Sequence, residues 1–64
     1  MENRIEEFRK KKGWSQQALA LRLATSQPTI DRWESGDVDP PLRKAIWLAR
    51  ELGTTIEELF LLED

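Results

Sequence analysis

The sequence contains neither cysteine nor histidine among its 64 residues. The chain can therefore form no disulfide and none of the usual zinc sites, although natural domains this short often depend on such a staple. Cysteine nucleophiles and histidine general bases are excluded as well. We therefore predict that the chain is not an enzyme and needs no metal or other cofactor.

Long apolar runs are also missing. No stretch approaches the roughly 18 apolar residues of a membrane span, and the first residues contain no apolar segment typical of a signal peptide. Hydrophobic residues make up 39% of the sequence, which suffices for one small core. These features predict a single soluble domain over residues 1–64 in the cytoplasm.

Charged residues are numerous, but the two signs are unevenly distributed along the chain. The net charge is −2, from ten basic and twelve acidic residues. Residues 1–36 contain seven basic and five acidic side chains, a net charge of +2, so residues 37–64 carry −4. A basic half favours nucleic acid as a partner, but ordinary solvated helix faces explain the same charges.

Helical periodicity predicts five short helices, at about 3–12, 16–23, 27–35, 41–52 and 56–60. Hydroxyl or amide side chains stand where each of four helices should begin, at Asn3, Ser15, Ser26 and Thr55. Glu6 and Glu58 complete two expected capping boxes. The expected inward face of the fourth helix consists of Leu42, Ala45, Leu48, Ala49 and Leu52.

The most specific segment runs from residue 13 to residue 36. Two Ser-capped helices are separated there by the very short connection Ala24-Thr25, which is too short to let them run antiparallel. Ile30 and Trp33 lie on one side of the second of these helices. This arrangement is typical of a helix-turn-helix, whose second helix enters the major groove of DNA.

The sequence resembles the phage repressor and Cro class of helix-turn-helix domains, the xenobiotic-response-element-like family, from residue 5 to about residue 60. The matching residues are Ile5, Phe8, Arg9, Gly13, Ser15, Gln16, Leu19, Ala20, Ser26, Thr29, Ile30, Arg32, Trp33, Glu34, Gly36, Pro40, Leu48, Ala49, Leu52, Gly53 and 56–60. The resemblance implies an all-α, compact five-helix lambda-repressor-like bundle without a cofactor. It also implies a repressor-like transcription regulator that binds double-stranded DNA, as a weak homodimer on a two-fold symmetric operator.

Candidate DNA contacts follow from this resemblance. The expected base contacts come from the third helix, at Gln27, Pro28, Asp31 and Arg32, and Gln27 is suited to adenine. Phosphates repel the Asp31 carboxylate unless it accepts from cytosine N4, so Asp31 is expected to act by excluding other sequences. The expected phosphate contacts are Ser15, Gln16, Thr29, Ser35 and Arg43. Simpler explanations remain open: Ser15 is a helix cap, and Gln27 is a polar first-turn residue.

Other residues are assigned to structure or to self-association. The resemblance implies an ion pair between Arg9 and Glu34 inside the fold, and it places Trp14 and Trp33 in the core. The expected dimer interface consists of Ile56, Phe60, Leu61 and Leu62. Trp47 falls off the apolar stripe of its helix, and we expect it to be exposed.

One departure from the family pattern supports a second hypothesis. Asp37 and Asp39 stand in a loop where the family usually has phosphate-binding Lys or Arg, and carboxylates there oppose DNA binding. Arg43, Lys44 and the lysines at 10–12 are candidates to compensate. The alternative function is a helical protein–protein adaptor or antitoxin-like module of the same fold with little DNA affinity.

Overall fold

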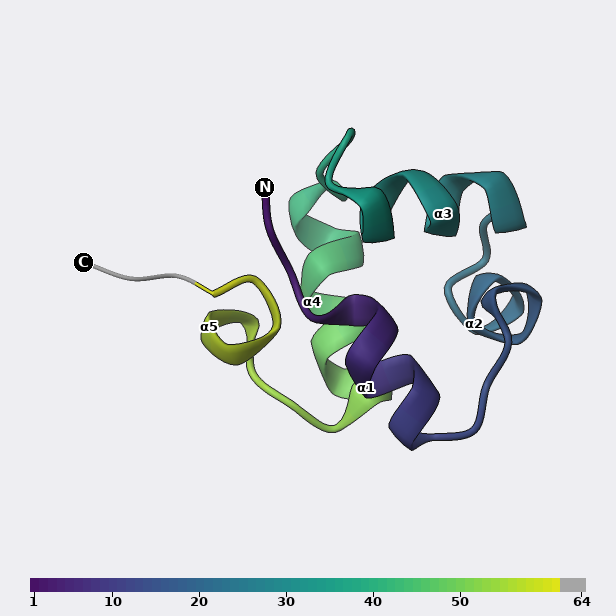
Figure 1. Ribbon diagram of the computed structural model, residues 1–64, viewed down its shortest axis with the longest axis horizontal. Coiled ribbons are helices and arrows are strands. Elements are labelled where there is room, and N and C mark those ends of the chain that lie inside the picture. Colours follow the sequence, from purple (N-terminus) through teal and green to yellow (C-terminus); the bar gives the residue numbers. More distant parts are fainter. Residues whose placement is uncertain (62–64) are drawn as a thin grey trace.

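A computed structural model describes residues 1–61 and shows five α-helices without any strand in that range (Figure 1). They are α1 (Ile5–Lys11), α2 (Gln16–Arg22), α3 (Gln27–Ser35), α4 (Leu42–Leu52) and α5 (Ile56–Leu59). The predicted all-α, five-helix fold is confirmed. None of these helices is long and apolar enough to cross a membrane.

Three of the four predicted caps form as expected. The side-chain oxygens of Ser15, Ser26 and Thr55 accept hydrogen bonds from backbone N–H groups three residues later. Each bond satisfies one of the amide groups that a helix start leaves without an intrahelical partner. These caps fix where α2, α3 and α5 begin.

The predicted capping box of the first helix is wrong. The helix begins at Ile5, two residues later than expected, and its N-cap position is Arg4. Asn3 instead accepts from the Ile5 amide at 3.1 Å and donates to the Trp33 carbonyl at 2.8 Å. Asn3 therefore bonds the amide two residues later and not the expected one three residues later, and its amide nitrogen joins the start of the chain to α3.

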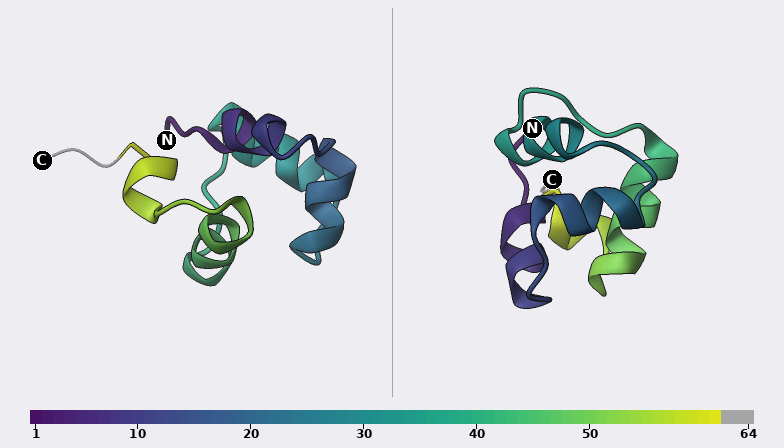
Figure 2. Two further views of the ribbon diagram at one scale, coloured as in Figure 1. Left: turned by 90° about the horizontal axis from the view of Figure 1, so that it is seen from below. Right: turned by 90° about the vertical axis from the view of Figure 1, so that its right-hand side faces the viewer.

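The turn between α2 and α3 depends on one residue with unusual backbone geometry. Ala24 has a φ of 54°, in the left-handed region that favours glycine. The Thr25 amide then donates to the Ala20 carbonyl at 2.9 Å. This turn sends α3 off at a steep angle to α2, which is seen nearly end-on in Figure 1 while α3 lies across the view (Figures 1 and 2).

The core lies where all five helices meet. It consists of the buried residues Ile5, Leu19, Ala20, Leu23, Ile30, Trp33, Ala45, Leu48, Ala49, Leu52, Leu59 and Phe60, with Phe8, Trp14 and Ile56 packed against it. The predicted inward stripe of α4 is buried except for Leu42, which is 73% exposed. Trp33 is buried, Trp14 is half-buried, and Trp47 is exposed as expected.

Candidate nucleic-acid interface

Helix α3 has an apolar face and a polar face. Ile30 and Trp33 point into the core, with exposed fractions of 0% and 4%. Pro28, Asp31 and Arg32 are exposed, and Gln27 is half-buried beside α2. All four predicted base contacts therefore lie outside the core on the second helix of the helix-turn-helix.

Arg9 of α1 and Glu34 of α3 form an ion pair beneath this surface. Arg9 Nε lies 2.6 Å from Glu34 Oε2, and Arg9 Nη2 lies 3.3 Å from Oε1. Both side chains are nearly buried, at 10% and 5% exposure. The hydrogen bond from Arg9 to the Glu34 carboxylate raises the pKa of the guanidinium above its ordinary value. Arg9 Nη1 also donates to the Trp14 carbonyl at 2.8 Å, so the arginine connects α1, α3 and the loop before α2.

Gln16, the first residue of α2, connects this ion pair to the polar face of α3. Its Nε2 donates to Glu34 Oε1 at 2.9 Å and to Asp31 Oδ1 at 3.2 Å, while its Oε1 accepts from Gln27 Nε2 at 2.5 Å. Glu34 and Asp31 are acceptors when ionised, so the amide nitrogen of Gln16 must face them. Sequence reasoning named these residues but did not predict that they bond to one another.

The five predicted phosphate contacts differ in what their side chains have left to donate. Ser15 Oγ accepts the Ala18 amide at 3.0 Å, which leaves its hydroxyl hydrogen available. Ser35 Oγ donates to the Arg32 carbonyl at 3.0 Å, and Thr29 shares a hydrogen bond with Ser26 at 2.9 Å. Arg43 is exposed and forms no ion pair within residues 1–61.

The hydroxyl of Ser35 is therefore poorly suited to its predicted role. Its hydrogen is engaged by the backbone, and its oxygen accepts the Asp37 amide at 3.3 Å. A phosphate needs a donor, so Ser35 must first give up its bond to Arg32 before it can serve as one. In this structure Ser35 stabilises the end of α3.

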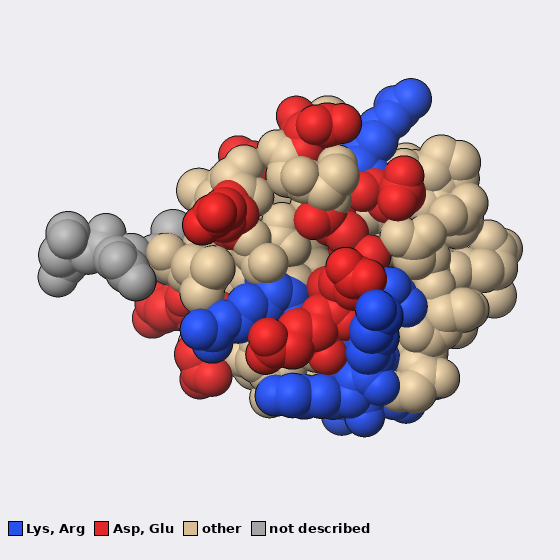
Figure 3. Space-filling view, in the orientation of Figure 1, with Lys and Arg blue, Asp and Glu red and all other residues tan. Residues whose placement is uncertain are grey.

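Most cations of the first half of the chain gather away from α3, and Arg32 is the exception because it is exposed on α3 itself. Lys and Arg atoms lie over the C-terminal end of α1 at the bottom of Figure 3, whereas the region over α2 on this face carries little charge. Lys10 and Lys11 pair with Glu6 and Glu7 at 3.0 and 3.7 Å. Lys44 donates to the Leu23 carbonyl at the end of α2. These lysines have structural partners, which weakens their proposed compensation for the acidic loop.

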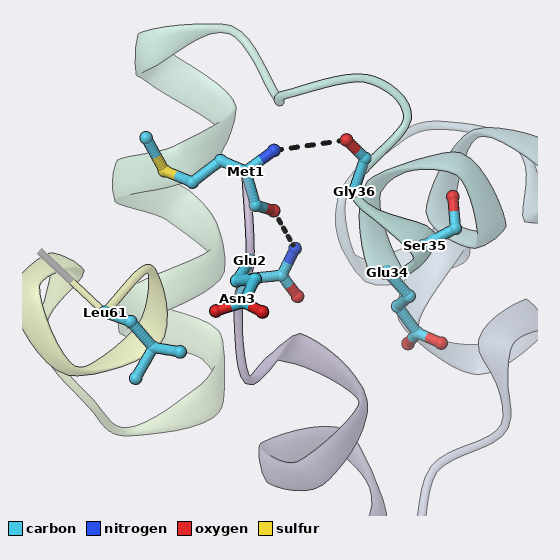
Figure 4. A pocket seen from close by; sticks show the side chains of 7 residues that line it. All are labelled: Met1, Glu2, Asn3, Glu34, Ser35, Gly36 and Leu61. Carbon is cyan, nitrogen blue, oxygen red and sulfur yellow. Dashed lines mark hydrogen bonds between the residues drawn. The ribbon is translucent and has the colours of Figure 1, made fainter.

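The acidic loop after α3 meets the start of the chain. The Met1 ammonium donates to the Gly36 carbonyl at 3.1 Å and lies 3.2 Å from Asp39 Oδ1. Figure 4 shows Met1, Glu2 and Asn3 alongside the end of α3, where they line a cavity of about 520 Å³ together with Glu34, Ser35, Gly36 and Leu61. The Arg4 amide donates to the Leu59 carbonyl at 2.7 Å, which fixes the segment to α5.

The predicted dimer residues do not all lie at the surface. Phe60 is 5% exposed and belongs to the core, so little of it is available to a partner. Ile56 and Leu61 are half-buried, and Leu62 lies outside the described residues. Ile56 and Phe60 line an apolar cavity of about 320 Å³ with Met1, Asp39, Pro40, Leu42 and Ala45.

Comparison with known proteins agrees with this architecture. A family model described as helix-turn-helix, of the Cro/C1 type, matches residues 5–59. The chain belongs to this helix-turn-helix family. The matched range begins with α1 and ends with α5, so the helix-turn-helix of α2 and α3 and all three supporting helices fall within it.

Relatives of this helix-turn-helix chain come from archaea and bacteria. An uncharacterized HTH-type transcriptional regulator of Archaeoglobus fulgidus is 41% identical over 64 residues, covering all of this chain and 91% of the relative. Similarly named proteins of Methanocaldococcus jannaschii and Bacillus subtilis are 36% and 30% identical, again over the whole chain and 97% of each relative. The likeness thus extends over nearly the full length of these regulators.

Proposed function

We propose that this helix-turn-helix transcriptional regulator binds double-stranded DNA with α3 in the major groove and Gln27 in contact with a base. The observation that carries the proposal is the bonded series Arg9–Glu34–Gln16–Gln27, which runs from the core to the polar face of α3. The relatives support it, because they are named as HTH-type transcriptional regulators.

The geometry of Gln27 fits this role. Its Nε2 uses one hydrogen on Gln16 Oε1, so the second hydrogen and Oε1 remain for another partner. One donor and one acceptor on a glutamine amide match the N7 and N6 groups of adenine in the major groove. Because Gln16 restrains Gln27, less side-chain freedom is lost when a base is bound.

Neighbouring residues supply further contacts in this proposal. Arg32 is exposed one turn beyond Pro28 and has no ion pair within residues 1–61, so its guanidinium is available for guanine or phosphate. The Ser15 hydroxyl at the start of α2 and Arg43 at the start of α4 are available for phosphates. Pro28 presents an apolar ring suited to a thymine methyl group.

Self-association on a two-fold operator completes the proposal. The apolar cavity beside Ile56 and the exposed Leu42 leave apolar surface on α4 and α5. Such a small contact belongs to the weak, transient class of interfaces. Sedimentation of Leu42→Ser and of the double variant Leu61→Ser/Leu62→Ser should show weaker association than the parent, whereas Leu21→Ser, which changes an equally exposed leucine of α2, should not.

Selection from a randomised duplex pool at two salt concentrations tests the function itself. The proposal predicts enrichment of a two-fold symmetric site, with affinity that falls as salt rises. The adaptor alternative draws support from Asp37 and Asp39, both exposed beside α3. A pool that shows no enrichment even at low salt favours the adaptor.

A further inference from the structure

The amide nitrogen of Gln16 has no hydrogen left for DNA. A glutamine amide carries two N–H donors. One lies on Glu34 Oε1 at 2.9 Å and the other on Asp31 Oδ1 at 3.2 Å, while Gln27 occupies the amide oxygen. A phosphate at the start of α2 must therefore displace one of these two carboxylates before Gln16 can bind it.

The two carboxylates are not equally easy to displace. Glu34 is nearly buried and is held at the same time by Arg9, so releasing it strands a charge inside the protein. Asp31 is exposed, forms no ion pair within residues 1–61, and holds Gln16 by the longer of the two bonds. The bond to Asp31 is therefore the easier of the two to break.

We infer that Asp31 acts on DNA binding through Gln16, because its carboxylate competes with a DNA phosphate for one N–H of the Gln16 amide. This inference rests on the proposed binding of DNA by α2 and α3. In the free protein, Asp31 occupies the donor; on binding, one anion replaces another on the same nitrogen. The bond from Gln16 to Glu34 persists throughout, so the amide stays oriented and Gln27 stays aligned for its base.

This competition acts on affinity and not on base choice. Every duplex presents the same phosphates, so the loss of the Asp31 bond weakens binding to all sequences by a similar factor. A duplex with the base that Gln27 contacts still binds after that loss, whereas a duplex that provides only phosphate contacts binds weakly. Asp31 thereby limits occupation of unrelated DNA, and it differs in this from a residue that accepts from cytosine N4.

The test measures dissociation constants for the selected duplex and for a scrambled duplex of equal length at fixed salt. Asp31→Ala removes both the charge and the acceptor, whereas Asp31→Asn removes the charge and keeps an acceptor oxygen. We expect Asp31→Ala to tighten binding to both duplexes by about two- to tenfold, the range of one net hydrogen bond. Asp31→Asn should tighten binding less. Asp37→Asn, an exposed carboxylate without a bond to Gln16, is the matched charge control.

A double-mutant cycle with Gln16→Ala shows whether Asp31 acts through Gln16. In the Gln16→Ala background, Asp31→Ala should change affinity no more than Asp37→Asn does. Equal effects with and without Gln16, or a changed base preference in Asp31→Ala, overturn the inference while DNA binding by α3 stands. Failure of the parent to bind any duplex at low salt refutes the proposed function and this inference together.

Discussion

The inward face of α3 and its outward face are held by different forces. Ile30 and Trp33 are fixed by packing against the core, whereas Gln27 is fixed by hydrogen bonds that lead back through Gln16 to Glu34. Packing tolerates replacement by residues of similar volume, but a chain of polar contacts fails when one member is lost. The comparison indicates that the position of Gln27 on the outward face depends on the nearly buried ion pair of Arg9 and Glu34.

The largest expected effect comes from breaking the ion pair between Arg9 and Glu34. Arg9→Met leaves the Glu34 carboxylate without its guanidinium in a nearly buried position, so we expect a loss of about 3–5 kcal/mol of folding free energy. Chemical denaturation measures it. Lys10→Met removes an exposed cation of the same helix and should stay within about 0.5 kcal/mol of the parent.

A double variant of the ion pair distinguishes the stability of the core from the DNA affinity of the outward face of α3. Arg9→Met combined with Glu34→Leu should recover much of the lost stability, because no charge is then stranded. The same double variant removes the buried acceptor of Gln16 and should still bind the selected duplex poorly. Recovery of full DNA affinity along with stability would show that Gln27 does not depend on the bond between Gln16 and Glu34.

The sequence predicts correctly the features that depend on residues close together in the chain, which are the helix caps and the apolar stripe of α4. Ser15, Ser26 and Thr55 act within three residues of themselves, so their caps follow from spacing. The inward stripe of α4 follows in the same way from periodicity, apart from Leu42 at its first residue, where no preceding turn covers the side chain.

Contacts between distant segments could not be predicted in this way. The side-chain oxygen of Asn3 bonds the nearby Ile5 amide, but its bond to the Trp33 carbonyl joins segments 30 residues apart and has no local signal in the sequence. The sequence alone offers Lys44 as a compensating cation for DNA, but its ammonium donates to the Leu23 carbonyl at the end of α2. The bonds of Gln16 join side chains from α2 and α3 to an ion pair anchored on α1, so no local pattern shows them.

The smallest expected effect concerns the turn that sets the two helices at their angle. Ala24 has a positive φ, which costs an L-residue more than glycine. Glycine loses more entropy on folding, so Ala24→Gly should leave a net gain of about 0.5–1 kcal/mol in stability. Ala18→Gly, inside α2, should instead destabilise by about 1 kcal/mol. Thermal denaturation of both variants checks the opposite signs, and a loss of stability in Ala24→Gly would contradict the assignment of strain to this turn.

The most direct test of the outward face is the affinity of Gln27→Ala for the selected duplex and for its single-base-pair variants at fixed salt. Because Gln27 contacts a base in the proposed complex, we expect a loss of about 1–3 kcal/mol in binding free energy on the selected duplex and a relaxed preference at one base pair of each half-site. Gln17→Ala, which changes an exposed glutamine of α2, should leave both unchanged. A Gln27→Ala variant that weakens binding to every duplex equally would contradict base contact by α3.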